Sequence, residues 1–190
     1  MAEGVGGLEP AATDKTFERR VALVTAIIAV VMAFSSLGGS NSTKEMLLAQ
    51  QQASDQWAFY QAKVIREHLY RTQAEQAKVA LLAQGKSLPP EARKALTEMQ
   101  ARFEAEAARY AKEKKEIEPE ARKLEAQRDV AAARDQNFDY AGVLFQIAIV
   151  LGSVAILSES RPVLVACLVF GVLAALLGAN GFLLLVKLPF

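Results

Sequence analysis

Uncharged apolar residues are concentrated in three stretches of the chain, and a strongly charged segment separates the first from the second. The stretches are Val21 to Leu37, Ala141 to Ser158 and Pro162 to Val186, and none contains Asp, Glu, Lys, Arg or His. A bilayer core about 30 Å thick needs roughly 17–25 such residues in a helix. In lipid the backbone must satisfy its own hydrogen bonds, which favours helices. The pattern predicts an all-α integral membrane protein with three transmembrane helices, over residues 18–39, 141–158 and 162–187.

The charged segment, residues 40–140, predicts a long water-exposed antiparallel helical hairpin. Gly38 to Asn41 is expected to break the first helix, and Ser42 with Glu45 has the spacing of a capping box that would start a new one. No Gly or Pro occurs from Thr43 to Gln84, and Ala, Gln, Glu, Lys and Leu dominate. Gly and Pro return in the predicted turn at residues 85–90. Residues 1–17 are small and polar and predict a disordered tail.

Apolar residues recur every seven positions along the second half of the hairpin. They are Leu96, Phe103, Tyr110, Ile117, Leu124, Ala131, Phe138 and Phe145. A seven-residue repeat falls short of two full helical turns and favours a left-handed supercoil with a neighbouring helix. Pro119 lies inside the repeat without changing its phase, so it predicts a kink and not a break. The positions three residues further on hold Met99, Glu106, Glu113, Glu120 and Gln127, which makes the seam weaker than a conventional coiled coil.

The first half of the hairpin offers a matching stripe in Trp57, Tyr60 and Val64. With a turn near Ser87, Trp57 is expected opposite Ile117, and Val64 opposite Tyr110. Aromatic residues also anchor interfaces, so a docking role for the Trp57 cluster stays open. The predicted packing residues of the hairpin are Trp57, Tyr60, Val64, Phe103, Tyr110, Ile117 and Leu124.

The apolar stretches contain small residues at the spacing that lets helix backbones approach closely. The predicted transmembrane packing residues are Ala148, Gly152, Gly171, Ala175, Gly178 and Asn180. We expect one small-residue face of the third stretch to pack on the second stretch, and the other to meet a second copy or a partner. Proton- and ion-coupled transporters usually carry an ionisable residue in the membrane, and these stretches have none.

The charge pattern gives little sign of chemistry. The chain has a net charge of +1, and the segment from Lys44 to Asp139 carries 17 Lys and Arg against 16 Asp and Glu, interleaved along the sequence. This is typical of a solvated helix surface with local ion pairs and does not favour nucleic acid. His68 is the only histidine, and Ile65 takes the place of the Glu that a helical metal motif would need. The sequence predicts no enzyme, with no catalytic residue, cofactor or metal site.

Two segments resemble a known family. The first, Asp55 to Lys63, reads DQWAFYQAK and follows shortly after the first apolar stretch. The second is Phe138 to Leu157. Both are similar to the bacterial membrane-protein family called domain of unknown function 4337, over about Arg20 to Phe182. The resemblance implies three spans with a helical insert. It implies no activity, and no functional residue is carried over from it.

These patterns together favour a non-enzymatic scaffold or accessory subunit in the cell inner membrane. It would assemble through its transmembrane helices and hairpin, with itself or with a larger membrane complex. The alternative is an oligomeric pore with the hairpins forming a vestibule, although Thr25, Ser35 and Ser36 are sparse for a pore lining. Arg19, Arg20 and Arg161 flank the apolar stretches and favour a cytoplasmic N-terminus, which places the hairpin outside the cytoplasm.

Overall fold

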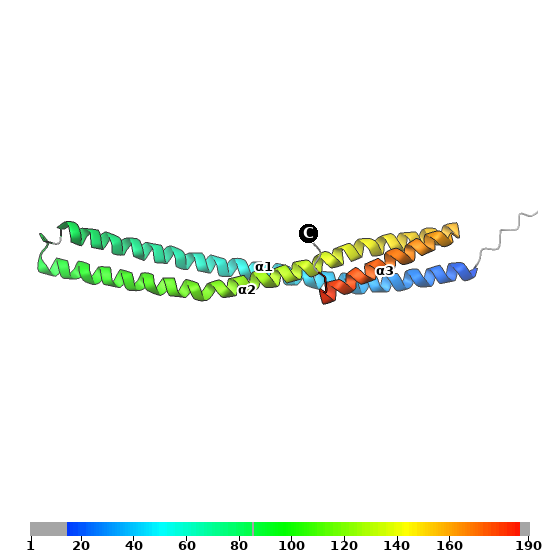
Figure 1. Cartoon of the computed structure of the whole chain (residues 1–190), viewed down its shortest axis with the longest axis horizontal. Helices are drawn as coiled ribbons and strands as arrows, with labels where there is room; N and C mark the ends of the chain where they lie inside the picture. The colour runs from blue at the N-terminus through cyan, green and yellow to red at the C-terminus, as the bar shows by residue number, and fades with distance from the viewer. Residues whose placement is uncertain (1–14, 85, 187–190) are drawn as a thin grey trace, which may run out of the picture. The chain divides into compact units, whose positions relative to one another are not determined.

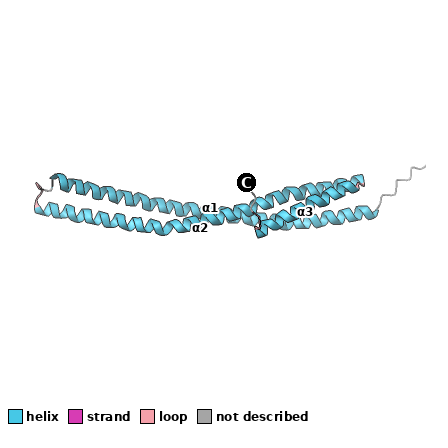
Figure 2. Cartoon of the chain, viewed as in Figure 1, coloured by secondary structure: helices cyan, strands magenta, loops and turns pink. Residues whose placement is uncertain are grey.

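Three long helices make up the part of the chain that the structure, a computed structural model, describes: residues 15–84 and 86–186. They are α1 (Lys15–Gln84), α2 (Pro90–Ser158) and α3 (Arg161–Leu183), and no strand occurs among these residues (Figures 1 and 2). Residues 1–14 of the predicted tail lie outside the described residues. Its last three residues were assigned wrongly, because the chain is already helical at Lys15.

The helices form two compact units, which we call the apolar unit (residues 15–43 and 132–186 of the described chain) and the hairpin unit (residues 44–131). In the apolar unit each of the three helices contains a segment long and apolar enough to cross a membrane. The core of this unit consists of Ile28, Ala141, Phe145, Ala148, Cys167 and Ala174. Small residues predominate in it, which lets the helices pack closely.

The predicted break at Gly38 to Asn41 is wrong, because α1 runs through these residues. The two glycines instead make room for an aromatic ring. A Cβ atom on Gly38 would lie 2.6 Å from Phe138 Cζ and 2.8 Å from Phe182 Cζ. Ser42 is buried within the helix and does not cap one. A glycine costs a helix about 1 kcal/mol relative to alanine, and close packing of Phe138 can offset that cost.

Buried positions follow a seven-residue repeat along α1 as well as α2. On α1 they include Val21, Ile28, Ser35, Ser42 and Ala49, with no shift of phase at the glycines. On α2 the predicted repeat is confirmed where Tyr110, Leu124, Ala131, Phe138 and Phe145 are buried, while Leu96, Phe103 and Ile117 are half-buried. Within the hairpin unit the second row of the α2 seam lies four residues after the first, not three, and its buried members are Ala107 and Ala121.

The hairpin unit is an antiparallel pair made by α1 and α2, joined by a short turn (Figure 1). The Ser87 and Leu88 amides donate to the Gln84 carbonyl at 2.9 and 3.1 Å, and Pro90 begins α2 as a proline can. Pro119 lies inside α2, which continues past it as predicted.

The predicted pairing of the two hairpin helices is wrong by about two helical turns. Tyr110 stacks on Tyr70, not on Val64, and the Trp57 indole donates to Glu125. Cross-helix ion pairs and ring stacking fix the register, and neither follows from apolar periodicity, because sliding by a heptad presents the same stripe.

The third helix ends at Leu183, four residues before the predicted end at 187. Leu184 has a φ of 49° in the left-handed region, and its amide donates to the Asn180 carbonyl at 2.7 Å. The Asn180 side chain accepts from the Val186 amide at 2.9 Å and donates to the Val186 carbonyl at 2.8 Å. These bonds close the helix end, so apolar composition alone overestimated its length.

Candidate functional site: a polar and aromatic network in the hairpin

Tyr110 lies at the centre of the most densely connected group of side chains in the hairpin unit. It is 6% exposed and stacks on Tyr70 with ring centroids 5.7 Å apart and an interplanar angle of 7°. Tyr70 also contacts Phe103 at 6.0 Å. Aromatic pairs of this kind add about 0.5–1.5 kcal/mol beyond the area they bury. The aromatic contacts therefore join α1 to α2 at this level.

Cations surround the ring of Tyr110. Lys63 Nζ lies 5.4 Å from the ring centroid, Arg66 Cζ 5.7 Å and Arg109 Cζ 4.7 Å. A cation within about 6 Å of a ring face is attracted by the ring quadrupole. Arg109 also donates to the Tyr110 hydroxyl at 2.8 Å. The ring thus holds cationic side chains from both helices.

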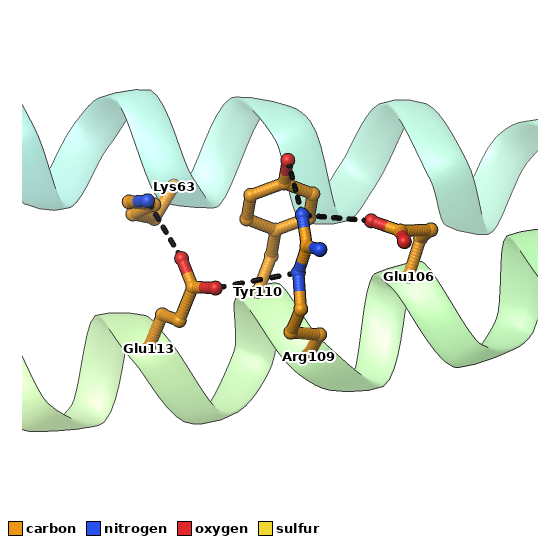
Figure 3. Close-up of polar contacts among 5 residues, drawn as sticks. All are labelled: Lys63, Glu106, Arg109, Tyr110 and Glu113. Atoms are coloured by element: carbon orange, nitrogen blue, oxygen red, sulfur yellow. Dashed lines mark hydrogen bonds and ion pairs between the residues drawn. The ribbon is translucent and has the colours of Figure 1, made fainter.

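Carboxylates pair with two of these cations, Lys63 and Arg109 (Figure 3). Glu113 accepts a hydrogen bond from Lys63 across the hairpin at 2.6 Å and pairs with Arg109 at 3.3 Å on its own helix. Arg109 also pairs with Glu106 at 2.9 Å. Charge-assisted bonds are shorter and stronger than neutral ones, so Lys63–Glu113 is a firm connection between the helices.

Glu67 makes a second connection and is more deeply buried, with 4% of the residue exposed. Its carboxylate pairs with Lys114 across the hairpin at 2.5 Å and with Arg71 one turn away at 2.9 Å. A buried carboxylate is costly unless paired and hydrogen-bonded. The Lys114 ammonium therefore must lie opposite Glu67, which restricts the helices to one register.

Both carboxylates titrate below their ordinary pKa of 4.5. The hydrogen bond from Lys114 is the main cause for the lowered pKa of Glu67, and the hydrogen bond from Lys63 for that of Glu113. In each case burial opposes the shift, and the charges of the neighbouring cations add to it. The ionised forms are therefore the ones that the folded hairpin stabilises.

Acid is expected to loosen the hairpin unit. A carboxyl with a lowered folded pKa contributes stability above its unfolded pKa, and that contribution is lost as pH falls through the folded value. The thermal midpoint of the hairpin should therefore be level above about pH 5 and fall as the solution is acidified below about pH 4.5. Melting curves followed by Trp57 fluorescence at a series of pH values would measure this. Glu113→Gln should reduce the acid-dependent part, and an unchanged pH profile would contradict the role of the pair.

The other predicted packing residues of the hairpin occupy different places. Trp57 donates to Glu125 at 2.9 Å and meets Tyr60 edge-on with centroids 5.4 Å apart. Leu124 is buried, whereas Val64 and Ile117 are half-buried and lie outside the network around Tyr110. Tyr70 and the pairing of Glu67 with Lys114 across the hairpin were not predicted from the sequence. A search for small or charged residues four positions after each heptad residue would have found Lys114, Ala107 and Ala121.

The three glycines among the predicted packing residues of the apolar unit face α1 of the same chain. A Cβ atom on Gly171 would lie 2.9 Å from Ile28 Cδ1, and one on Gly178 would lie 3.1 Å from Ser35 Oγ. Gly152 faces Thr25 in the same way, Ala148 is buried and Ala175 is partly buried against the core. The expectation that one small-residue face of α3 meets another copy is wrong for Gly171 and Gly178, because α1 fills that space.

Asn180, the polar member of the predicted packing residues, forms a hydrogen bond within the chain. Its Nδ2 donates to Asn137 Oδ1 at 2.8 Å, and Asn137 is 1% exposed. The Asn137 side chain in turn donates to the Ala133 carbonyl at 2.7 Å. This bond connects α2 to α3 near the C-terminal end of α3.

The arrangement is suited to holding helices together. In the hairpin network each of the three carboxylates pairs with a cation, so none is positioned as a free base or nucleophile. Across residues 15–84 and 86–186 no group of three or more His, Cys, Asp or Glu side chains is placed to hold a metal ion. The geometry therefore defines an all-helical protein with three apolar helix segments and a polar, ion-paired helical hairpin.

This chain belongs to the family described as domain of unknown function (DUF4337), whose model matches residues 17–184. The match covers all three helices and includes the network around Tyr110. No curated protein and no solved structure shows significant similarity to the chain.

Proposed function

We propose that this protein is a non-enzymatic scaffold or accessory subunit of the cell inner membrane. Its three apolar segments would cross the bilayer, and its hairpin would extend into the aqueous phase as a surface for assembly, with itself or with a larger membrane complex. The hairpin network carries this proposal. It joins α1 to α2 through Lys63–Glu113 and Lys114–Glu67, and its charges are used to fix the hairpin and not to bind a substrate.

The apolar unit supports anchoring in a bilayer. Its three segments are strongly apolar and mostly exposed, with only 22–28% of the residues in each segment buried. Exposed apolar side chains around a small-residue core are what lipid-facing helices require. A protein surface in water seldom exposes so large a contiguous apolar area.

The positions of the polar residues in the first apolar segment do not favour the alternative, an oligomeric pore. Thr25 faces Gly152 and donates to the Val21 carbonyl at 2.9 Å, and Ser35 faces Gly178 and is 4% exposed. A pore needs polar side chains on a free face of its lining helices. Two of the three residues weighed for that role lie inside the bundle of their own chain.

Purification of the tagged full-length protein in mild detergent, followed by mass measurement of the intact particle, tests the proposal. The expected result is a mass above that of one chain, from further copies or from co-purifying membrane proteins. A particle containing a single chain and no partner would refute the scaffold. Ion flux through liposomes containing the pure protein would instead favour the pore.

We expect the hairpin to lie outside the cytoplasm. The start of α1 and the turn between α2 and α3 lie at the same end of the apolar unit (Figure 1). Arg19 and Arg20 are near the start of α1 and Arg161 is the first residue of α3, and such charges favour the cytoplasmic side. In a Cys167→Ala background, Ser87→Cys should react with a membrane-impermeant thiol reagent in cells whose inner membrane is intact. Labelling only after that membrane is opened would reverse the orientation.

A further inference from the structure

The outward side of α1 in the hairpin unit carries an uncharged stripe. Its residues recur at intervals of three or four and lie on the opposite side of the helix from the seam with α2. They are Ala58, Ala62, Ile65, Leu69, Thr72, Gln76, Val79 and Ala83, and all are exposed. The large members are among the most exposed of the hairpin, with Ile65 at 67%, Leu69 at 53% and Val79 at 63%. We call this set the outer stripe of α1.

The outward side of α2 has the opposite character. From Lys44 to Gln84 the chain has 9 Asp, Glu, Lys and Arg residues, but from Glu91 to Ala131 it has 20. Those that point away from the seam on α2 include Lys94, Glu98, Lys112, Glu116 and Lys123, all exposed. Solvation explains the α2 surface, whereas it gives no reason for a charge-free row on α1 that exposes Ile65, Leu69 and Val79.

We propose that the outer stripe of α1 pairs with the same stripe of a second copy of this chain, side by side and in parallel. The inference rests on the proposed membrane anchoring, which gives all copies the same orientation. Two such copies related by a two-fold axis normal to the membrane bring each residue of the contact close to its own counterpart.

Symmetry then decides which face can be used. In a parallel symmetric pair any charge within the contact meets the same charge, and like charges repel. The outer stripe has no charge over its whole length. The charges that flank it, Arg66 and Glu75, lie on opposite edges of the stripe, so neither is brought against its own copy. The outward face of α2 would instead place Lys112 against Lys112 and Glu116 against Glu116.

The stripe also has the spacing of a coiled-coil seam. Intervals of four and three residues alternate without a slip from Ala58 to Ala83, which lets two helices keep contact through a left-handed supercoil. Ile65, Leu69 and Val79 provide the apolar layers. Gln76 would face its own copy, and a polar residue at one such position specifies the register at some cost in stability. Confinement to one membrane raises the effective concentration of the copies, which compensates for a contact with few large residues.

Cysteine cross-linking of the full-length protein in its native membrane tests this pairing. In a Cys167→Ala background, Thr72→Cys should form a disulfide-linked dimer under mild oxidation, because the two thiols face each other within disulfide range. Thr97→Cys is the matched control, since Thr97 is an exposed threonine on α2. We expect at least about tenfold faster cross-linking at position 72. Equal rates at the two positions would overturn the proposal.

A charge-swap experiment identifies the occupant. Leu69→Lys and Leu69→Glu, each added to Thr72→Cys, should slow cross-linking at least about tenfold, because each places like charges together. Co-expression of the two variants with different tags should restore mixed dimers. If another protein covers the stripe, both variants lose it and co-expression restores nothing, which would overturn a second copy as the occupant.

The mass of the intact particle separates this inference from the proposed function. An oligomer or complex without cross-linking at position 72 would overturn the outer stripe as the contact and leave the scaffold standing. A single chain without partners would overturn both. Unchanged thermal melting of the Leu69 variants, followed by Trp57 fluorescence, would show that the exposed substitutions act on assembly and not on folding.

Discussion

Phe138→Ala is expected to lower the free energy of unfolding of the apolar unit by about 3–5 kcal/mol, the usual cost of removing a buried phenylalanine. Phe138 is 5% exposed and meets Phe182 edge-on with ring centroids 4.8 Å apart. Its ring also fills the space left by Gly38 and Gly181. Loss of the ring would leave a cavity that all three helices border.

The single cysteine is a natural reporter for this prediction. Cys167 is completely buried in the core of the apolar unit, so a thiol-reactive dye should label it only as that unit opens on heating. Phe138→Ala should lower the temperature of labelling by several degrees. Phe34→Ala is the control, because Phe34 is 66% exposed on the same unit. Equal shifts for both variants would contradict the role assigned to Phe138.

The glycines test the same contact from the other side. Gly38→Leu would force a side chain against Phe138 and Phe182, and such overpacking typically costs about 1–3 kcal/mol. Gly142 is a matched control on α2, since a Cβ atom there would meet nothing within 4 Å. Gly142→Leu should leave the labelling temperature of Cys167 unchanged or raise it, because leucine is the better helix former. If Gly38→Leu also left the labelling temperature unchanged, packing of Phe138 would not require a glycine at position 38.

The second large effect concerns the buried carboxylate of the hairpin. Lys114→Met is expected to destabilise the hairpin unit by about 1–3 kcal/mol, because Glu67 would stay buried with one partner fewer. Its remaining partner, Arg71, has a side chain that is 57% exposed, so it can only partly replace Lys114. Trp57, the only tryptophan, reports melting of this unit by fluorescence.

A double variant shows whether the cost comes from the unpaired charge. Glu67→Leu combined with Lys114→Met should restore stability to within about 1 kcal/mol of the original, as replacement of buried ion pairs by apolar residues often does. Glu118→Ala removes one partner of the exposed pair with Arg122 and should cost less than about 1 kcal/mol. Equal losses for Lys114→Met and Glu118→Ala would mean that burial of Glu67 does not govern the hairpin.

Much of the helical architecture was predictable, because it depends on local composition and periodicity. The three apolar stretches coincide with helix segments long enough to cross a membrane. The turn at residues 85–90 has the Gly and Pro residues that end one helix and begin another, and α2 starts at Pro90. The seven-residue repeat on α2 predicted most members of the buried row from Tyr110 to Phe145, because a helix turns through the same angle at every residue.

The predictions that were wrong depend on contacts that a residue's own propensity and spacing do not reveal. Gly38 reads as a helix breaker from its own propensity, but packing against Phe138 keeps α1 continuous. Gly171 and Gly178 have the spacing of an interface, but the sequence does not say that α1 of the same chain occupies it. Asn180 ends α3 early through bonds to Val186 that apolar composition does not reveal.

The sequence by itself determined which segments are helical, which are apolar enough for a bilayer and which face of α2 is buried. Each of these depends on residues close together in the chain. Only the tertiary structure decided the hairpin register, because heptad stripes fit each other at several offsets and the pairing of Glu67 with Lys114 selects one. It also decided that the small residues of α3 serve the chain's own bundle, since partners far apart in sequence compete for the same groove and close packing admits only one of them.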